Sequence, residues 1–371
     1  MLLNRFGPRR LMTFGVVLTG LAFVLMSRVG ALWQFYGSVV LLTIGMSFGT
    51  FIVVVATTGN WFVRLRSRAM AVLSSASAIG GLAVPAVVWT IDSQGWRDAL
   101  LYVGIGFWVI GIPAAMAMRW RPEDYGQAPD GGPAPAAASG SPGGPRRAAV
   151  REMDIGVRQA LRTRLFWQMT VAVSLGHLMT SAGLLHIPAL VSFEVTRTTA
   201  GLAVLGVSAA SFFGRLAVGF LGDFVDKRFL IAGAFVSMIF GAGVLASING
   251  GFLNVPAGIG LPLFSVFYGF GFGGSIPVRL AMLADYFGRR SFGSILGILS
   301  TCSAAFGAAG PLFVGAMYDA TENYRTPFLA LCALLALGVP ILLTMQSPSR
   351  LAAGARLRRA RAARPGLYRQ G

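Results

Sequence analysis

The chain has 371 residues, of which 55% are hydrophobic and only 12% are charged, and its mean hydropathy is +0.69. Such a composition excludes a soluble domain of this length and predicts an integral membrane protein. The net charge of +18 does not indicate a nucleic-acid partner, because the basic residues gather on one side of the predicted membrane spans.

Apolar runs of about 18 residues or more can cross the roughly 30 Å hydrocarbon core of a bilayer. Lipid cannot satisfy an open sheet edge, so all of these runs should be helices. The sequence contains ten of them, at 11–27, 32–58, 68–91, 98–118, 165–193, 198–221, 228–248, 257–283, 292–317 and 326–346. An all-α polytopic membrane protein is therefore predicted. The basic start is also typical of a signal peptide, but no small-residue cleavage site follows the first run.

Lysine and arginine are distributed unevenly between the two sides of these runs. If residue 1 is cytoplasmic, 25 of the 31 basic residues lie on the cytoplasmic side. The opposite side holds Arg28, Arg97, Arg197 and Arg325. This asymmetry follows the positive-inside rule and predicts that both termini are cytoplasmic.

Two segments outside the runs divide the chain. Residues 127–145 consist mostly of Gly, Pro, Ala and Ser, which is typical of a flexible linker between two bundles. The tail carries seven arginines and no acidic residue, so we expect attraction to anionic lipid, or else a solvated topology signal. The predicted organisation is an incomplete N-terminal bundle (1–118), a linker (119–164), a six-helix bundle (165–346) and a basic tail (347–371).

Residues 4–85 and 223–311 carry the same landmarks in the same order, about 220 residues apart. The first copy has them at 4–10, 45–50, 61–68 and 78–85, and the second at 222–228, 269–274, 286–293 and 304–311. Two further runs, 165–193 and 198–221, precede the second copy only. We therefore expect a two-fold protein whose first half lacks its first two helices, with four helices in the first bundle and six in the second.

The basic turns resemble the cytoplasmic loop of the major facilitator superfamily, which carries a Gly-x-Leu-Ala-Asp-Arg-x-Gly-Arg-Arg pattern. The second copy retains Gly219, Leu221, Gly222, Asp223, Lys227 and Arg228. The first retains Arg5, Gly7, Arg9 and Arg10 but has Asn4 where the family has Asp. Further landmarks at 121–126, 284–297 and 310–324 resemble the branch of oxalate/formate antiporters and monocarboxylate transporters.

The resemblance implies a twelve-helix fold of two pseudo-repeated bundles, with this chain supplying family helices 3–12. It implies a monomeric secondary active transporter of small organic anions, mono- or dicarboxylates, that works by alternating access in the bacterial cytoplasmic membrane. Its gating charges would be Asn4, Arg5, Arg9, Arg10, Asp223, Lys227 and Arg228. Efflux of amphipathic drugs and a truncated, transport-inactive paralogue are the alternatives.

Arg215 and Arg279 are the basic residues that lie within runs. An ionisable residue in a span is costly and marks a candidate functional site. Arg215 lies eight residues before Asp223, about 12 Å inside the cytoplasmic end, where its guanidinium could hold a carboxylate. The resemblance gives Arg215 the position of a substrate-binding arginine, with snorkelling as the alternative. For Arg279, close to the interface, snorkelling is preferred.

His177 and His186 share the run 165–193, which corresponds to a cavity-lining family helix. Nine residues at 100° each place the two rings on opposite faces of a straight helix. Each is a candidate substrate ligand or proton carrier, or else a hydrogen-bonded histidine between helices.

No Asp or Glu lies in the middle of a run, so no buried carboxylate is present to carry protons. Cys302 and Cys332 both lie within runs, which gives neither a disulfide framework nor a metal site. No nucleophile set, metal cluster or phosphate loop is recognisable, so the sequence predicts neither an enzyme nor a cofactor.

Overall fold

The computed structural model describes residues 2–49, 51–80, 84–131, 156–250, 253–288 and 291–346. Within these ranges the regular elements are helices, and Ile248 forms an isolated bridge with Val255. The protein is an all-α polytopic membrane protein, and eight segments of the described chain are long and apolar enough to cross a membrane. The predicted tail (347–371) and the middle of the predicted linker lie outside the described residues.

The chain divides into two compact units. Unit 1 is Met1–Arg147 with Phe292–Ile298, and unit 2 is Ala148–Ser291 with Leu299–Gly371. We call the end of each unit that carries residues 4–10 or 222–228 its basic end.

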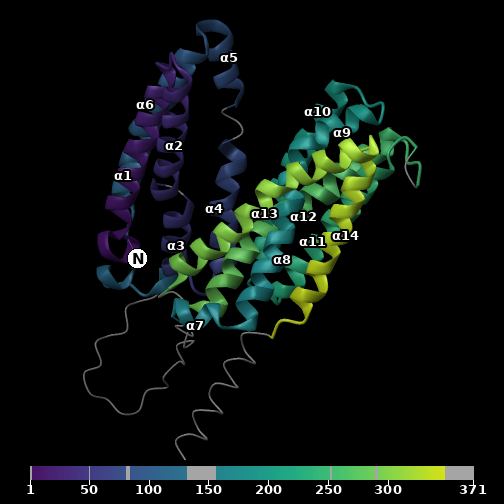
Figure 1. Ribbon diagram of the computed structural model, residues 1–371. Coiled ribbons are helices and arrows are strands. Elements are labelled where there is room, and N and C mark those ends of the chain that lie inside the picture. Colours follow the sequence, from purple (N-terminus) through teal and green to yellow (C-terminus); the bar gives the residue numbers. More distant parts are fainter. Residues whose placement is uncertain are drawn as a thin grey trace, which may run out of the picture. The chain divides into compact units, whose positions relative to one another are not determined.

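Unit 1 is built on antiparallel helices that pack along their length (Figure 1). They are α1 (Leu2–Ser27), α2 (Leu32–Gly49), α3 (Phe51–Trp61), α4 (Arg66–Gly80), α5 (Val84–Gln94) and α6 (Trp96–Ala117), followed by the 3₁₀ turns η2 (Glu123–Tyr125) and η3 (Pro129–Gly131). The first helix kinks at Gly7, whose φ of 75° suits glycine, and continues from Pro8, which is favoured in a first helical turn.

Unit 2 contains the longer helices. They are α7 (Val157–Leu161), α8 (Arg164–Ser181), η4 (Ala182–Leu185), α9 (His186–Ser192), α10 (Arg197–Leu221), α11 (Lys227–Ser247), α12 (Ala257–Phe287), α13 (Phe292–Thr321) and α14 (Arg325–Leu343). Thr163, Thr196 and Asp226 cap α8, α10 and α11 by accepting a hydrogen bond from a first-turn amide.

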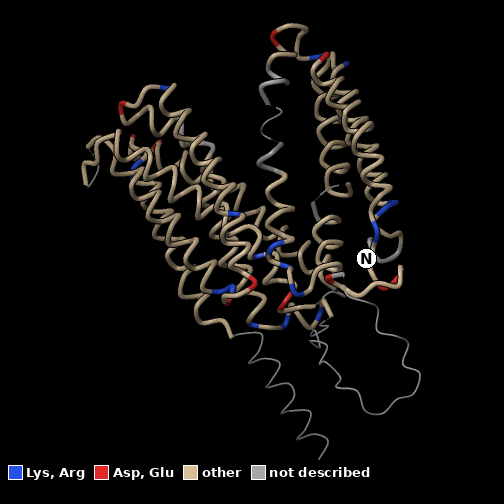
Figure 2. Tube along the Cα trace, turned by 180° about the vertical axis from the view of Figure 1, so that it is seen from behind, with Lys and Arg blue, Asp and Glu red and all other residues tan. Residues whose placement is uncertain are grey.

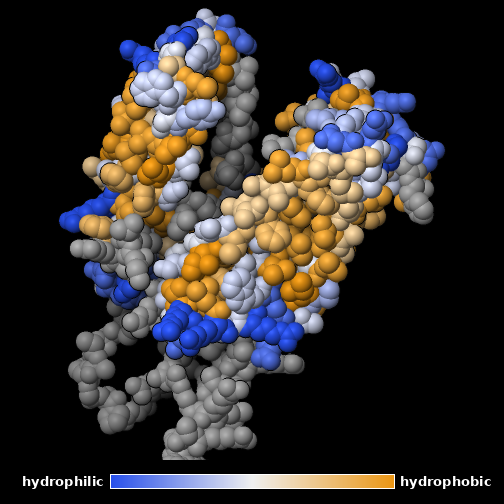
Figure 3. Space-filling view, in the orientation of Figure 1, coloured by the Kyte–Doolittle hydropathy of each residue, from blue (hydrophilic) through white to orange (hydrophobic). Residues whose placement is uncertain are grey.

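The sides of both units are apolar, and their ends are polar. Figure 3 shows hydrophobic surface along the helices and hydrophilic surface at their ends, and Figure 2 shows the charged residues mostly at those ends. Large apolar side chains such as Trp33, Ile110 and Leu312 are more than 70% exposed. In water such surfaces would drive aggregation, whereas in a bilayer they face lipid.

The run 165–193 is not a single straight span. The structure divides it into α8, the 3₁₀ turn η4 and α9. Pro188 lies in the first turn of α9, where its missing N–H costs least, but it cannot continue a helix from α8 because its ring clashes with the carbonyl of residue 184. Neither α8 nor α9 is among the eight segments that are both long and apolar enough to span alone.

Helices α10 and α12 pack closely because glycines remove the side chains between them. A methyl group added at Gly214 would overlap the backbone of Phe270, and one added at Gly273 would overlap the backbone of Ser211. Small residues at such crossings let helix backbones touch, which is a main source of packing energy in lipid.

The first part of the predicted linker is held against unit 1. Residues 119–131, which we call the strap, run beside the turn between α3 and α4. Asp130 accepts hydrogen bonds from the backbone amides of Val63 (3.2 Å), Arg64 (2.8 Å) and Leu65 (3.3 Å). Its carboxylate thus caps the amides that precede α4, where the helix dipole favours negative charge.

Replacement of Asp130 by alanine is expected to loosen this turn. Loss of a capping side chain costs about 1 kcal/mol, so the amides of residues 63–65 should exchange hydrogen faster and the strap should be cut more readily by protease. Hydrogen exchange followed by mass spectrometry measures both segments. Asp124→Ala is the control, because Asp124 is exposed within the same strap. Equal exchange in the two variants would contradict the capping role.

Candidate functional site

Arg215 is a buried arginine in the membrane-spanning part of α10, with only 6% of its surface exposed. Its Nε atom has no hydrogen-bond partner among the residues that the structure describes. Its guanidinium carbon lies 5.8 Å from the centre of the Phe272 ring on α12, at the outer limit of a cation–π contact. A buried guanidinium nitrogen without a partner is costly, and a bound anion would supply that partner.

Ser211 lies one turn before Arg215 on α10 and was missed by the sequence analysis. It is 2% exposed, and its hydroxyl has no hydrogen-bond partner within the described ranges. Several other buried helical serines donate to a backbone carbonyl, as Ser303 does to Leu299 and Ser265 does to Ala203. The spacing of four residues places Ser211 and Arg215 on one face of the helix. The Ser211 hydroxyl and the Arg215 Nε therefore lie on the same face of α10, and each can still donate a hydrogen bond.

His186 begins α9 and lies within a group of aromatic rings. It is 3% exposed, and its Nε2 atom has no partner in the described part of the chain. Its ring centre lies 5.1 Å from that of Phe264, 4.8 Å from that of Tyr268 and 5.6 Å from that of Phe328. These rings come from α12 and α14. The Tyr268 hydroxyl donates to the carbonyl of Met179 on α8 (3.2 Å), which ties these aromatic rings to the helix before the break.

His177, in the middle of α8, faces a different helix. Its ring lies directly against Gly307 of α13, where an added methyl group would overlap it. Arg279, the other basic residue within a predicted run, is half-buried on α12. The three predicted substrate ligands thus contact different neighbours: His177 packs on α13, His186 packs on α12 and α14, and Arg215 lies beside α12.

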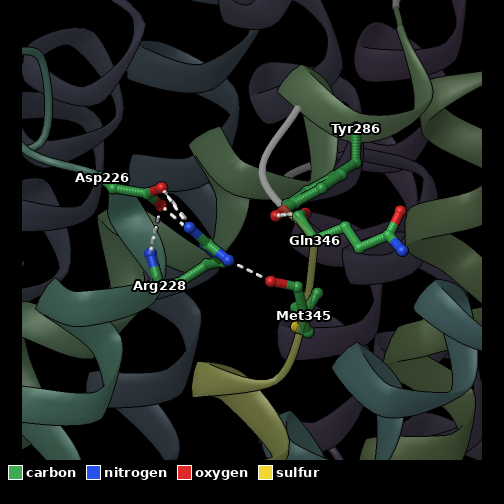
Figure 4. Close-up of polar contacts among 5 residues, drawn as sticks. All are labelled: Asp226, Arg228, Tyr286, Met345 and Gln346. Carbon is green, nitrogen blue, oxygen red and sulfur yellow. Dashed lines mark hydrogen bonds and ion pairs between the residues drawn. The ribbon is translucent and has the colours of Figure 1, made fainter. Parts of the chain in front are cut away.

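The basic end of unit 2 carries a network of polar contacts, part of which Figure 4 shows. Asp226 accepts from the Arg228 guanidinium, with the closest pair 2.6 Å apart. The same guanidinium donates to the carbonyl of Met345, just after α14. The Tyr286 hydroxyl, from the end of α12, donates to the next carbonyl, that of Gln346, at 2.7 Å.

Two more of the predicted gating residues lie at this end. Lys227 forms an ion pair with Asp285, at 2.8 Å between Nζ and Oδ2. This pair joins the start of α11 to the end of α12. Asp223 lies in the turn between α10 and α11, with one carboxylate oxygen buried.

The ion pair of Asp226 should make the basic end sensitive to acid. The hydrogen bond from Arg228 lowers the pKa of Asp226 below its ordinary value of about 3.9. A lowered pKa adds stability above the ordinary value, and that stability is lost as the pH falls through the folded-state pKa. Asp226→Asn should therefore lower the unfolding temperature at about pH 6 but have less effect at about pH 3. Thermal unfolding in detergent measures this, and an equal effect at both pH values would contradict it.

In unit 1 the predicted gating residues differ in their contacts and exposure. The Arg9 Nε atom donates to the carbonyl of Met118, just after α6, at 2.7 Å. Arg10 is exposed. The side chains of Asn4 and Arg5 lie outside the described part of the structure. Nearby, the Trp61 indole donates to the carbonyl of Arg119 at 2.9 Å.

No group of three or more His, Cys, Asp or Glu residues that could hold a metal ion occurs among the described residues. Cys302 and Cys332 are free thiols. The polar groups of the membrane-spanning part thus offer hydrogen-bond donors and positive charge, which suit an anion.

Comparisons with known proteins agree with this architecture. The family model described as Major Facilitator Superfamily matches residues 1–250 and 185–367. Monocarboxylate transporter 13 of Bos taurus is 26% identical over 345 residues, which cover 92% of this chain and 74% of that protein. The agnestins efflux protein AgnL12 of Paecilomyces divaricatus is 24% identical over 313 residues, covering 83% of this chain and 65% of that protein.

The fold is also found among solved structures. The crystal structure of the human organic anion transporter MFSD10 (TETRAN) aligns with a TM-score of 0.63 and 16% identity, covering 90% of this chain and 77% of that chain. Its likeness shows the fold alone. This family and this fold are those of transporters and not of enzymes. The chain belongs to the Major Facilitator Superfamily.

Proposed function

We propose that this transporter moves small organic anions, mono- or dicarboxylates, by alternating access, and that Arg215 binds the carboxylate. The observation that carries the proposal is the buried guanidinium whose Nε has no partner among the described residues. A carboxylate would accept two parallel hydrogen bonds from it, which are charge-assisted and stronger than neutral ones. The Ser211 hydroxyl, one turn away, would donate to a further oxygen of the same ligand.

The sequence relatives support the anion class, because their names include a monocarboxylate transporter. His177 and His186 are proposed as further ligands or proton carriers, and each would act from its own helix interface. The charges at the basic ends, from Arg9 and Arg10 to Asp223, Lys227 and Arg228, are proposed as gating groups together with Asn4 and Arg5. Exchange of one anion for another requires no buried carboxylate, in keeping with the absence of Asp and Glu from the middle of the predicted runs.

We further propose that both basic ends face the cytoplasm of a bacterial cell, because the basic residues gather there. The bundles would then be 1–118 and 165–346, joined by the linker 119–164. The tail 347–371 would lie against anionic lipid. The protein is proposed to act as a monomer.

Efflux of amphipathic compounds is the second candidate. The aromatic rings of Phe264, Tyr268 and Phe328 around His186 are apolar but almost completely buried, so they form packed core and would bind a ring-bearing ligand only after a rearrangement. One relative is an efflux protein.

Uptake into proteoliposomes separates the two candidates. The purified protein should accumulate radiolabelled mono- or dicarboxylates, and an excess of unlabelled carboxylate should compete while the matching amide should not, because only the carboxylate pairs with Arg215. Transport of neutral amphiphiles without any carboxylate uptake would overturn the anion proposal in favour of efflux.

A further inference from the structure

Arg279 of α12 is the second arginine within the predicted runs, and the transport proposed for Arg215 does not use it. It is half-buried, and it makes no hydrogen bond or ion pair with the residues that the structure describes. Asp285, the acidic residue nearest to it along α12, pairs instead with Lys227 of α11 at 2.8 Å. Arg279 therefore carries a positive charge that the described residues leave uncompensated.

The open strip of α12, which we define as Phe272, Ile276 and Arg279, is the half-buried face of a stretch that is otherwise buried. Every other residue from 271 to 284 is buried. Spacings of four and three residues place the three side chains of the strip on one face of the helix. The guanidinium carbon of Arg215 lies 5.8 Å from the centre of the Phe272 ring. Arg279 thus shares its face of α12 with the aromatic neighbour of Arg215.

The packing of α10 on α12 sets the height of one arginine relative to the other. Both helices run towards the basic end, and they touch at Gly214 and Gly273. These crossings place Arg215 level with about residue 274 of α12. Arg279 lies about five residues further along, which is about 8 Å nearer the basic end at 1.5 Å per residue.

Snorkelling to the membrane interface, which the sequence favours for Arg279, does not suit the direction of its side chain. The Cα–Cβ bonds of a helix tilt towards its N-terminus. Because Asp285 pairs with Lys227 at the start of α11, α12 ends at the basic end and its N-terminus lies away from that end. The stem of Arg279 therefore leads towards the level of Arg215, and it would have to turn back to reach the interface.

Two uncompensated charges on neighbouring helices favour a ligand with two negative charges. Like charges repel one another more strongly in the membrane interior than in water, because their surroundings are less polar. A monoanion at Arg215 leaves the charge of Arg279 uncompensated, whereas a dianion compensates both. A carboxylate oxygen lies about 3 Å from the guanidinium nitrogen that binds it. A short aliphatic dicarboxylate therefore bridges two guanidinium groups at this separation.

We propose that Arg279 binds the second carboxylate of a dicarboxylate whose first carboxylate is bound by Arg215, and that it thereby selects dicarboxylates over monocarboxylates. The inference rests on the proposed function and narrows its substrate class. The apolar carbon chain of the ligand lies along the open strip, against Phe272 and Ile276. A monocarboxylate of the same length gains only the contact with Arg215.

Uptake of dicarboxylates and of their half-amides tests this selection, because the two ligands differ by one carboxylate. Proteoliposomes with the parent protein are given the straight-chain dicarboxylates from oxalate to adipate, each beside its half-amide. For the best dicarboxylate, KM should be about tenfold or more below that of its half-amide. Arg279→Gln should bring the two KM values within about twofold by weakening the dicarboxylate alone, and Arg279→Lys should lie between, since it keeps the charge but not the fork.

Two controls accompany this measurement. Arg197→Gln should leave both KM values unchanged, because Arg197 is an exposed arginine at the start of α10. Arg215→Gln should weaken both ligands. If Arg279→Gln weakens both ligands equally, or weakens neither, Arg279 does not bind the second carboxylate. Uptake of monocarboxylates without this preference overturns the inference and leaves the proposed function standing, whereas uptake of no carboxylate at all overturns both.

A charge exchange distinguishes selection from misfolding, since it predicts a gain of uptake. Arg279→Glu should reject dicarboxylates and take up an amino acid with its ammonium group at the far end, such as 4-aminobutyrate. The new carboxylate would pair with that ammonium group, while Arg215 still binds the carboxylate. The parent should not take up this compound. An Arg279→Glu protein that unfolds at the parent's temperature in detergent and still prefers dicarboxylates would refute the inference.

Discussion

Carboxylate uptake should fall by one to two orders of magnitude when Arg215 is replaced by glutamine. The variant keeps a hydrogen-bonding side chain but loses the charge and the fork that match a carboxylate, and hydrogen bonds to charged groups contribute about 1.5–3 kcal/mol each. Arg215→Lys keeps the charge without the fork, so its uptake should lie between that of Arg215→Gln and that of the unchanged protein. Initial rates in proteoliposomes, at equal amounts of inserted protein, measure this.

Two controls separate binding from folding. Arg197→Gln alters an exposed arginine on the same helix and should leave uptake unchanged. The unfolding temperature of Arg215→Gln in detergent should be equal to or above that of the parent, because an unpartnered buried charge has been removed. If Arg215→Gln takes up carboxylate as the parent does, the guanidinium has a structural role and the substrate proposal loses its main support.

The spans could be predicted from composition because lipid imposes the simplest of structural rules. Each of the ten apolar runs coincides with one, two or three consecutive helical elements of the described chain. Hydropathy counts apolar side chains without regard to backbone geometry, so it could not show that 165–193 is divided by η4. The sequence did contain the cause, since Pro188 limits how a helix can continue from α8.

The course of the strap could not be predicted. Residues 127–131 have the composition of a linker, but Asp130 caps amides that lie 65 to 67 residues earlier in the chain. Asp130 lies between a proline and a glycine, and nothing in this local sequence indicates that its carboxylate binds amides so far away in the chain. The linker was therefore predicted to begin where the apolar run 98–118 ends, and the structure shows that its first part, residues 119–131, is held against unit 1.

Arg215 could be recognised because a charge in a lipid span is rare. Ser211 could not, since serine is common in such helices and normally bonds to its own backbone. The structure shows that the Ser211 hydroxyl makes no such bond to the described residues. Arg97 and Arg325 were counted only as the minority charge of one side, and their partners, which are backbone carbonyls, leave no trace in a sequence.

The packing of α10 on α12, which positions Arg215, depends on glycine and should fail when a side chain is added. A methyl group at Gly273 would overlap the backbone of Ser211, which cannot move aside as a flexible side chain could. Overpacking costs about 1–3 kcal/mol and more where backbone must shift. Gly273→Ala should therefore lower the unfolding temperature markedly, and Gly273→Leu should prevent accumulation of folded protein.

Gly258 of the same helix provides the matched control, because an added methyl group there meets open space. Gly258→Ala should be neutral or slightly stabilising, since alanine favours the helix over glycine by about 1 kcal/mol. Thermal unfolding and size-exclusion profiles in detergent compare the two variants. Equal stability of Gly273→Ala and Gly258→Ala would mean that α10 and α12 do not touch at this crossing, and Ser211 and Arg215 would then lack the neighbour that encloses them.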